Sequence, residues 1–368
     1  MSDEQQHIAR LTPLHEALAA LDTLVRAVTP REIDARDALG AVVAADVVAG
    51  PLPVRAMALR DGFAVRAADL DGAGGYAPIP LSSVPPSIEA GDELPQGMDT
   101  VVAPAAVVVA DGHAEAVAPV APGEGVIPAR SESDPARPLR EAGERIRGAD
   151  IAVLAAAAVG RVSVRQPCLQ VTAAREDLRL APALDFVMRD CAARGCRVQR
   201  RNGRDVDDVL LVPEADAVVI VGGSGVGSRD RSVHALASKG QVVIHGIGLM
   251  PGETAAIGHV GSRPVIVVPG QLDAAMAVWL TLGRRLLGRL ARLTESEPVS
   301  MRTLTRKVTS PVGLAEIVPV HRSGDTAEPL ARQHWPLWAL ARANGWLLVP
   351  AGSEGYAAGS TVAINEWP

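Results

Sequence analysis

The residues best suited to chemistry form a glycine-rich segment, GGSGVGSRD at 222–230, directly after a buried-strand pattern at 215–221. Glycines after a parallel strand let the backbone approach a ligand, and the N-terminus of the following helix offers free N–H groups to an anion. Side chains that could add contacts are those of Ser224, Ser228, Arg229, Asp230 and Arg231. The spacing is neither a Rossmann nor a Walker A fingerprint. The segment predicts a phosphate or other oxyanion site, with tight packing around no ligand as the alternative.

A second glycine turn ends another buried-strand pattern, VIVVPGQ at 265–271. The carboxyl edge of a doubly wound sheet is where such folds bind ligands. Two turns of this kind in one domain predict a shared anion-binding cleft, in which the backbone amides at both strand ends converge.

Alternating strand and helix patterns position these turns. Strands are expected at CLQVTAA, CRVQRR, DAVVIVGG, QVVIHG and PVIVVPG, and helices between most of them and at AAMAVWLTLGRRLL. Alternation of this kind predicts a doubly wound α/β domain with a mostly parallel sheet over residues 168–293.

The rest of the chain divides around this domain. The first region begins with a helix, which is predicted by apolar residues at helical spacing from Leu14 to Leu24. A strand, a short helix and a second strand are expected over 31–49. The segment 137–167 is expected to pack back beside it, so 1–50 plus 137–167 form one N-terminal region. Short apolar runs broken by proline and glycine predict an inserted β-rich domain at 51–136 and a small β domain at 294–368.

Composition excludes several classes of protein. The chain has 368 residues, 48% of them hydrophobic, which suits two or three folded domains. A net charge of −6 and an aromatic content of 2% argue against a nucleic-acid surface. No apolar stretch approaches the roughly 20 residues of a membrane span, and the acidic, polar N-terminus predicts a cytoplasmic protein. Three cysteines, at 168, 191 and 196, match no common zinc spacing and predict buried reduced thiols.

Five ordered motifs resemble the MoeA family, the molybdopterin molybdenumtransferases related to the E domain of gephyrin. They are ALRDGFAV at 58–65, GDELPQGMDTVV at 91–102, GGSGVGSRD at 222–230, HGIGLMPG at 245–252 and VPGQ at 268–271. The resemblance implies a homodimer in which a MogA-like α/β domain binds molybdopterin or its adenylylated form. It also implies a helical dimerisation region, the inserted β domain, a C-terminal β-barrel, and a molybdoenzyme or MogA-like protein as a further partner.

The resemblance also implies site residues. In the family, molybdate is inserted into the dithiolene of adenylylated molybdopterin with release of AMP, so Mg²⁺ and molybdate would take part in a catalytic member. The acids would be Asp61, from the inserted domain, and Asp230. The pterin cradle would consist of Gly222, Gly223, Ser224, Gly225, Gly227, Ser228, Pro251, Gly252, Pro269 and Gly270. Metal ligands are not identified.

The chain departs from the family around this cradle. A KPGKP-type segment reads MPGET at 250–254, so an oxyanion there would meet one neutral and one negative side chain. Alanine or arginine replaces oxygen-bearing residues at Ala58, Ala90 and Arg145, and Met57 replaces an asparagine. An STGDEL-type stretch reads AAREDL at 173–178, and a GSG-type loop reads QHWPLW at 333–338. Arginines that could form a substitute anion clamp are Arg55, Arg60, Arg145, Arg229 and Arg231.

Three functions stay open. The chain is an enzyme that inserts molybdate, a non-catalytic carrier, chaperone or regulatory protein for the cofactor, or a binder of another phosphorylated ligand such as a nucleotide. Two of the polar residues also have purely structural interpretations. Asp61 could form a turn before Gly62, and His245 could be an interior histidine whose ring nitrogens are hydrogen-bonded within the protein. Acids that could bind Mg²⁺, but that suit solvated surface better, are Glu176, Asp177, Asp205, Asp207 and Asp208.

Overall fold

The computed structural model describes residues 6–200, 206–296 and 298–368. The chain divides into two compact units. The first comprises Met1–Ala45, Ala142–Gly148 and Arg161–Pro368, and the second Asp46–Glu141 and Ala149–Gly160. Within the described ranges, no helix has the length and apolar character needed to cross a membrane.

The centre of the first unit is a sheet in the order β14-β13-β15-β19-β18-β16. Its strands are β13 (Cys168–Ala173), β14 (Arg197–Arg200), β15 (Ala217–Val221), β16 (Gln241–His245), β18 (Ala256–Val260) and β19 (Arg263–Val268). The four strands from β14 to β19 run parallel, whereas β18 and β16 are antiparallel additions. The predicted doubly wound, mostly parallel sheet is confirmed, and β18 is a strand that the sequence interpretation did not contain.

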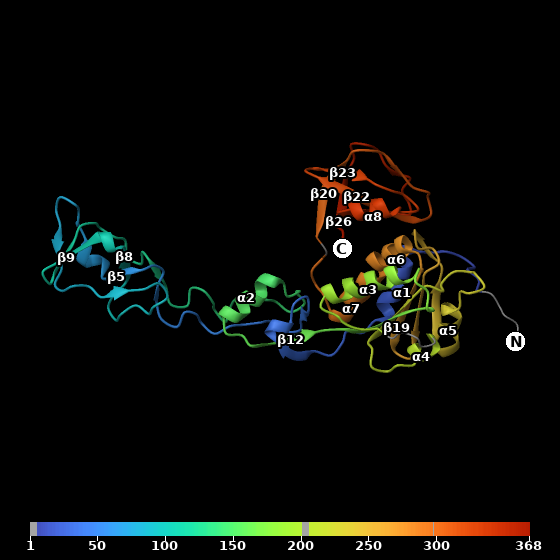
Figure 1. Cartoon of the computed structure of the whole chain (residues 1–368), viewed down its shortest axis with the longest axis horizontal. Helices are drawn as coiled ribbons and strands as arrows, with labels where there is room; N and C mark the ends of the chain where they lie inside the picture. Colours follow the sequence, from blue (N-terminus) through green and yellow to red (C-terminus); the bar gives the residue numbers. More distant parts are fainter. Residues whose placement is uncertain (1–5, 201–205, 297) are drawn as a thin grey trace. The chain divides into compact units, whose positions relative to one another are not determined.

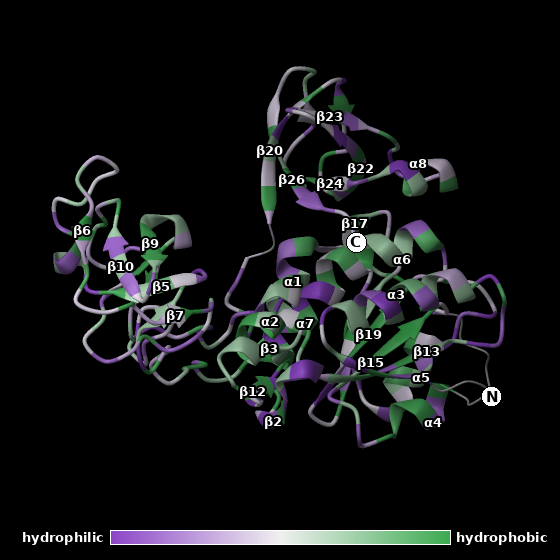
Figure 2. Cartoon of the chain, turned by 60° about the vertical axis from the view of Figure 1, so that its left-hand side comes forward, coloured by the Kyte–Doolittle hydropathy of each residue, from purple (hydrophilic) through white to green (hydrophobic). Residues whose placement is uncertain are grey.

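Alternate residues of β15 face two separate cores because successive side chains of a strand point to opposite faces. Ala217, Val219 and Val221 belong to one apolar cluster, and Val218 and Ile220 to another. The first core is covered by α1 (Leu14–Leu24), α3 (Ala181–Ala193), α6 (Leu272–Val278) and α7 (Arg284–Ala291), and the second by α4 (Val206–Leu210) and α5 (Ser232–Lys239). Figure 2 shows these two layers of helices on either side of the sheet.

A small sheet in the order β2-β12-β3 follows α1. Its strands are β2 (Arg31–Asp34), β3 (Val42–Val43) and β12 (Arg161–Arg165), and the short helix η1 (Ala35–Asp37) lies between the first two in sequence. This confirms the predicted strand, short helix and strand, and β12 pairs antiparallel with both strands. Gly40 and Gly195 meet here, each with a positive φ, and a Cβ at Gly40 would lie 2.7 Å from the nitrogen of Gly195.

The C-terminal strands close into a barrel in the order β22-β23-β20-β26-β24, with β24 pairing back to β22. They are β20 (Val299–Leu304), β22 (Ala315–Ser323), β23 (Thr326–Pro329), β24 (Gly345–Val349) and β26 (Thr361–Glu366). This confirms the predicted barrel (Figure 1). Two short strands, β1 (Thr12–Pro13) and β17 (Ile247–Met250), extend the same sheet: β17 pairs with β1 on one side and β22 on the other.

The second unit contains short strands only, apart from α2 (Gly148–Ala156) and single 3-10 turns among its described residues. Its sheets have the orders β7-β5-β8, β6-β10-β9 and β11-β4. The strands are β4 (Met57–Ala58), β5 (Gly62–Val65), β6 (Ile79–Pro80), β7 (Ser87–Ile88), β8 (Thr100–Val102), β9 (Val107–Ala110), β10 (His113–Ala116) and β11 (Val126–Ile127). They all lie within the segment expected to be a β-rich insertion.

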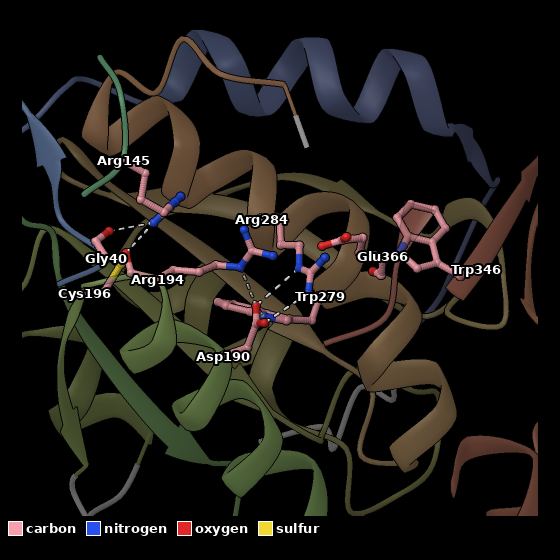
Figure 3. Close-up of polar contacts among 9 residues, drawn as sticks. All are labelled: Gly40, Arg145, Asp190, Arg194, Cys196, Trp279, Arg284, Trp346 and Glu366. Atoms are coloured by element: carbon pink, nitrogen blue, oxygen red, sulfur yellow. Dashed lines mark hydrogen bonds and ion pairs between the residues drawn. The ribbon is translucent and has the colours of Figure 1, made fainter. Parts of the chain in front are cut away.

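A buried ionic network fixes α3 to the helices that follow the sheet (Figure 3). Asp190 accepts hydrogen bonds from Nε1 of Trp279 at 2.8 Å and from NH2 of Arg284 at 3.0 Å, and it also pairs with Arg194. Burial by itself would raise the pKa of Asp190, but the charges of Arg284 and Arg194 and the hydrogen bonds to the carboxylate hold it below its ordinary value.

The cysteines are buried free thiols, as predicted. Burial raises the pKa of Cys196 to about 12 and that of Cys191 further. Both thiols are therefore protonated at neutral pH and behave as small apolar side chains.

Candidate functional site

The two glycine turns lie side by side at the carboxyl edge of the sheet. Their strands, β15 and β19, are parallel neighbours, with Val221 in register with Val268. The N–H of Gly222 donates to the carbonyl of Val268 at 2.8 Å. A Cβ at Gly270 would lie 3.4 Å from Cα of Gly222. The two predicted glycine turns therefore lie side by side, whereas a shared anion-binding cleft between them stays a prediction.

Leu180 packs over this junction. Its side chain is 4% exposed. A Cβ at Gly270 would lie 2.5 Å from Cδ2 of Leu180, and one at Gly222 would lie 3.0 Å from both of its methyl groups. These two glycines thus make room for a leucine of the protein. This agrees with the alternative to a ligand site, in which the glycines serve tight packing. The sequence gives no sign of this role for Leu180, because Leu180 belongs to the loop after β13, far from either turn in the chain.

The next part of the loop is held by Ser232, the first residue of α5. Gly223 has a positive φ, and a Cβ there would collide with the hydroxyl of Ser232. That hydroxyl donates to the carbonyl of Gly222 at 2.8 Å, while the N–H of Ser232 donates to the carbonyl of Gly223 at 3.0 Å.

Ser224 links the loop to the segment after β17. It is 2% exposed, and its hydroxyl lies 2.9 Å from that of Thr254. Its carbonyl oxygen lies 2.9 Å from Nε2 of His245, which is thereby a partnered imidazole. The glycine loop and the 250–254 segment are therefore neighbours, as a common site requires.

Asp230 folds back onto the loop. Its Oδ2 accepts a hydrogen bond from the N–H of Gly227 at 3.1 Å. Cβ atoms at Gly225 and Gly227 would lie 2.6 and 3.0 Å from that same oxygen. These glycines therefore give the carboxylate room to cap the turn. Gly227, Ser228 and Arg229 are exposed.

The 250–254 segment offers no cation to a ligand. Pro251 and Gly252 are buried, and a Cβ at Gly252 would lie 2.6 Å from Cγ2 of Val278 in α6. Met250 is 8% exposed. The carboxylate of Glu253 accepts the N–H of Gly252 at 3.0 Å. Pro269 is also buried, and Gly270 is half-buried.

The N-terminus of α5, where an anion would be expected, is occupied by the side chain of Gln6. Its Oε1 accepts the N–H groups of Val233 at 2.9 Å and His234 at 3.0 Å. Its Nε2 donates to the carbonyls of Gly223 at 3.1 Å and Gly225 at 2.7 Å. Nothing in the sequence around Gln6 signals this contact, which joins residues more than 200 positions apart.

Three of the arginines considered for an anion clamp bind the protein itself. NH1 of Arg145 donates to the carbonyls of Gly40 at 2.8 Å and Arg194 at 2.7 Å (Figure 3). Arg60 donates to the carbonyl of Val101 and pairs with Glu124, and Arg55 pairs with Glu93. Arg229, in contrast, is exposed and makes no side-chain hydrogen bond within the described ranges.

Asp61 belongs to the second unit, whereas the other predicted site residues belong to the first. It is exposed, and its Oδ1 accepts the N–H of Ala90 at 2.8 Å. Gly62 follows it in β5, where a Cβ would collide with the carbonyl of Val102. The catalytic roles of Asp61 and Asp230 stay predictions.

The described acids do not form a magnesium site. Asp177 accepts hydrogen bonds from Arg179 and Arg175, and the bond to Arg179 holds its pKa well below the usual range. Among residues 6–200, 206–296 and 298–368, no group of three or more His, Cys, Asp or Glu side chains is placed to hold a metal ion. Asp205 lies outside these ranges.

Comparison with known proteins agrees with the motif pattern. Residues 12–158 match the model of the MoeA N-terminal region (domain I and II), and 302–367 that of the MoeA C-terminal region (domain IV). Residues 202–289, which hold both glycine turns, match a model described as "Probable molybdopterin binding domain".

Individual relatives are distant but span the whole chain. A protein of Methanocaldococcus jannaschii named "Putative molybdopterin biosynthesis protein" is 23% identical over 370 residues, 91% of each chain. Two solved structures of molybdopterin biosynthesis MoeA protein from Pyrococcus horikoshii are 23% and 20% identical and have TM-scores of 0.73 and 0.77. Their alignments cover 97% of this chain and 99% or 100% of the other, so the complete fold is shared.

Proposed function

The chain belongs to the MoeA family, and on this premise we propose that it serves molybdenum-cofactor biosynthesis by binding molybdopterin, or its adenylylated form, at the carboxyl edge of the α/β sheet. The observation that carries the proposal is the position of the exposed residues 227–229 at the edge where the neighbouring parallel strands β15 and β19 end. Both strands lie in the segment that matches the molybdopterin-binding model. Ligands of doubly wound sheets bind at such an edge.

The exposed part of the loop supplies the ligand contacts in this proposal. Gly227, Ser228 and Arg229 are exposed beside the start of α5. Arg229 brings a positive charge that no carboxylate of the described residues neutralises, and guanidinium groups bind phosphate in two-pronged hydrogen bonds. The proposed binding position of the pterin phosphate is this loop, supported by its exposure and by the charge of Arg229.

Charge reversal tests the location. The full chain and an Arg229→Glu variant are titrated with molybdopterin, followed by pterin fluorescence. We expect the variant to bind at least about tenfold more weakly, since a like charge replaces a contact that contributes roughly 1.5–3 kcal/mol. Lys239→Glu is the matched control, because Lys239 is exposed at the opposite end of α5. Equal losses in both variants, or no binding by the unmodified chain, would contradict the proposal.

A non-catalytic carrier, chaperone or regulatory role is favoured over molybdate insertion by the 250–254 segment. Met250 is buried, and Glu253 holds the neighbouring backbone, so this segment presents no cation to molybdate or phosphate oxygens. Molybdate-dependent release of AMP from adenylylated molybdopterin separates the two roles: a carrier releases none. We also propose a homodimer in the cytoplasm, with a molybdoenzyme or a MogA-like protein as partner, which sedimentation and co-purification test.

A further inference from the structure

The start of the described chain lies on the proposed binding edge. Residues 6–13, here called the N-terminal strap, run from the glycine loop to strand β1. At its far end the N–H of Thr12 donates to the carbonyl of Gly246 at 3.0 Å, and β1 pairs with β17. Gly246 has a positive φ, and a Cβ there would collide with Ile8 and lie 2.8 Å from the carbonyl oxygen of Arg10. The strap is thus seated at a position where only glycine leaves room for it.

Gln6, at the other end of the strap, uses both polar atoms of its side-chain amide in hydrogen bonds. Its oxygen accepts two N–H groups from the first turn of α5, and its nitrogen donates to two carbonyls of the glycine loop. Exchanging the amide oxygen and nitrogen would set donor against donor and acceptor against acceptor, so the orientation follows from its partners.

The two N–H groups that Gln6 takes are those that a helix offers to an anion. First-turn amides have no partner inside the helix, and they carry the positive end of its dipole. The neutral oxygen of Gln6 therefore stands where an oxygen of a phosphate would bind. A phosphate would also bring negative charge to the dipole, which the carboxamide does not.

The middle of the strap is anchored by Ile8 beside Gly246, while other side chains of the strap are exposed. His7, Ala9 and Arg10 are exposed, and none of their side chains makes a hydrogen bond within the described ranges. His7 and Arg10 border an open pocket of about 410 Å³, together with Glu16 and His245. Departure of Gln6 from the loop would break its four hydrogen bonds and leave the pairing of β1 with β17 unchanged.

We propose that the N-terminal strap is an internal competitor of the phosphate-bearing ligand: Gln6 closes the α5 N-terminus, and ligand binding requires it to leave. This inference rests on the proposed function, because it concerns the same edge. A site that is open only part of the time has an apparent affinity lowered by the open fraction. By linkage, the ligand must in turn loosen the strap.

Substitution of Gln6 tests the competition on the full chain. Gln6→Ala removes all four hydrogen bonds, and Gln6→Asn keeps the amide but shortens its reach. We expect both variants to bind molybdopterin about tenfold more tightly than the unmodified chain, a gain of about 1.4 kcal/mol. His7→Ala, a change in the same strap without a contact to the loop, should leave affinity unaltered. Inorganic phosphate should compete more effectively in the two Gln6 variants.

Trypsin cleavage after Arg10 gives a second readout. In the unmodified chain, molybdopterin should speed release of the N-terminal peptide, detected by mass spectrometry. In Gln6→Ala, release should already be fast without ligand.

The outcomes separate the two proposals. Equal affinity of all variants with ligand-independent cleavage would overturn the strap while leaving the proposed function in place. Weaker binding by both Gln6 variants would also overturn it, since Gln6 would then be part of the cradle. If no chain binds molybdopterin, the proposed function fails, and this inference with it.

Discussion

Asp273 and His334 are joined by a 2.7 Å hydrogen bond between Oδ2 and Nδ1, which ties the first turn of α6 to the loop before α8 (Leu337–Arg342). The same carboxylate oxygen accepts the N–H of Trp335 at 3.0 Å. Asp273 has a side-chain exposure of 6%, whereas that of His334 is 79%. The buried carboxylate is therefore the centre of this connection between the α/β sheet domain and the barrel, and the imidazole is its outer partner.

Removal of the carboxylate should weaken the connection. Asp273→Ala leaves the N–H of the buried Trp335 without an acceptor, and an unmade bond of this kind costs about 1–3 kcal/mol. We expect urea unfolding to show a loss of that size. His334→Ala serves as the control and should cost about 1 kcal/mol, because the imidazole is exposed and the carboxylate keeps its bond to Trp335. A larger loss in His334→Ala than in Asp273→Ala would refute this assignment.

The Asp190 network should make stability depend on pH in the acid range. Because the pKa of Asp190 is lower in the folded chain than in the unfolded chain, the unfolded chain binds its proton first as the pH falls. The stabilisation is therefore complete above the ordinary carboxyl pKa of about 4 and is lost as the pH falls through the depressed value.

Asp190→Asn removes this pH dependence. We expect its unfolding free energy to fall less steeply between about pH 5 and about pH 2 than that of the unmodified chain. At neutral pH the variant should be less stable by roughly 3 kcal/mol, since the buried Arg284 loses the negative charge of Asp190. Asp185→Asn is the control on the same helix, because Asp185 is half exposed. If the unfolding free energies of Asp190→Asn and the unmodified chain fell equally steeply with falling pH, Asp190 would not be the source of the pH dependence.

The packing of Leu180 against the second glycine turn is tested by a double-mutant cycle. Gly270→Ala adds a methyl group 2.5 Å from Cδ2 of Leu180, and we expect a loss of about 1–3 kcal/mol from overpacking. Leu180→Ala alone should cost about 2–5 kcal/mol through the cavity it leaves. The double variant should lose less than the sum of both, as measured by urea unfolding. Simple additivity would show that the two residues do not share this space.

Restoring the acid of the family at position 145 should not restore chemistry. Arg145→Asp takes away both hydrogen bonds from NH1 and sets a carboxylate toward the carbonyl oxygens of Gly40 and Arg194. We expect a loss of about 2–4 kcal/mol in thermal unfolding and no gain in molybdate-dependent AMP release. Arg36→Asp, at an exposed position in η1, should unfold like the unmodified chain. A stable Arg145→Asp variant with new AMP release would contradict this role.

Local patterns were enough to predict the central fold. The run from Ala217 to Val221 is apolar on both faces because helices cover both, and α3 follows from apolar residues at helical spacing. β17 and β18 were missed because Pro251 and Gly252 interrupt that stretch, and because β17 pairs with strands that lie far away in sequence. Pairing of this kind leaves no periodic signal.

The site was predictable only as far as its backbone. Two glycine turns after parallel strands had to meet at one edge, and they do. The side chains that fill the edge, Leu180, Ser232 and Gln6, come from other parts of the chain, so their roles depend on tertiary contacts. Arg145 shows the same limit: its charge suggested an anion contact, but its position directs it to backbone carbonyls.

Strand β17 also determines how separable the C-terminal barrel is. It lies between β1 and β22, so the N-terminal strap and the barrel both pair with the same strand. Removal of the barrel from the rest of the chain would expose the edge of β22 at Ala315 and Glu316. An exposed strand edge can pair with other chains and lead to aggregation. The barrel strands alone are thus not an independent unit. A chimera that exchanges the barrel between homologues would have to include β1 and β17 from the same homologue.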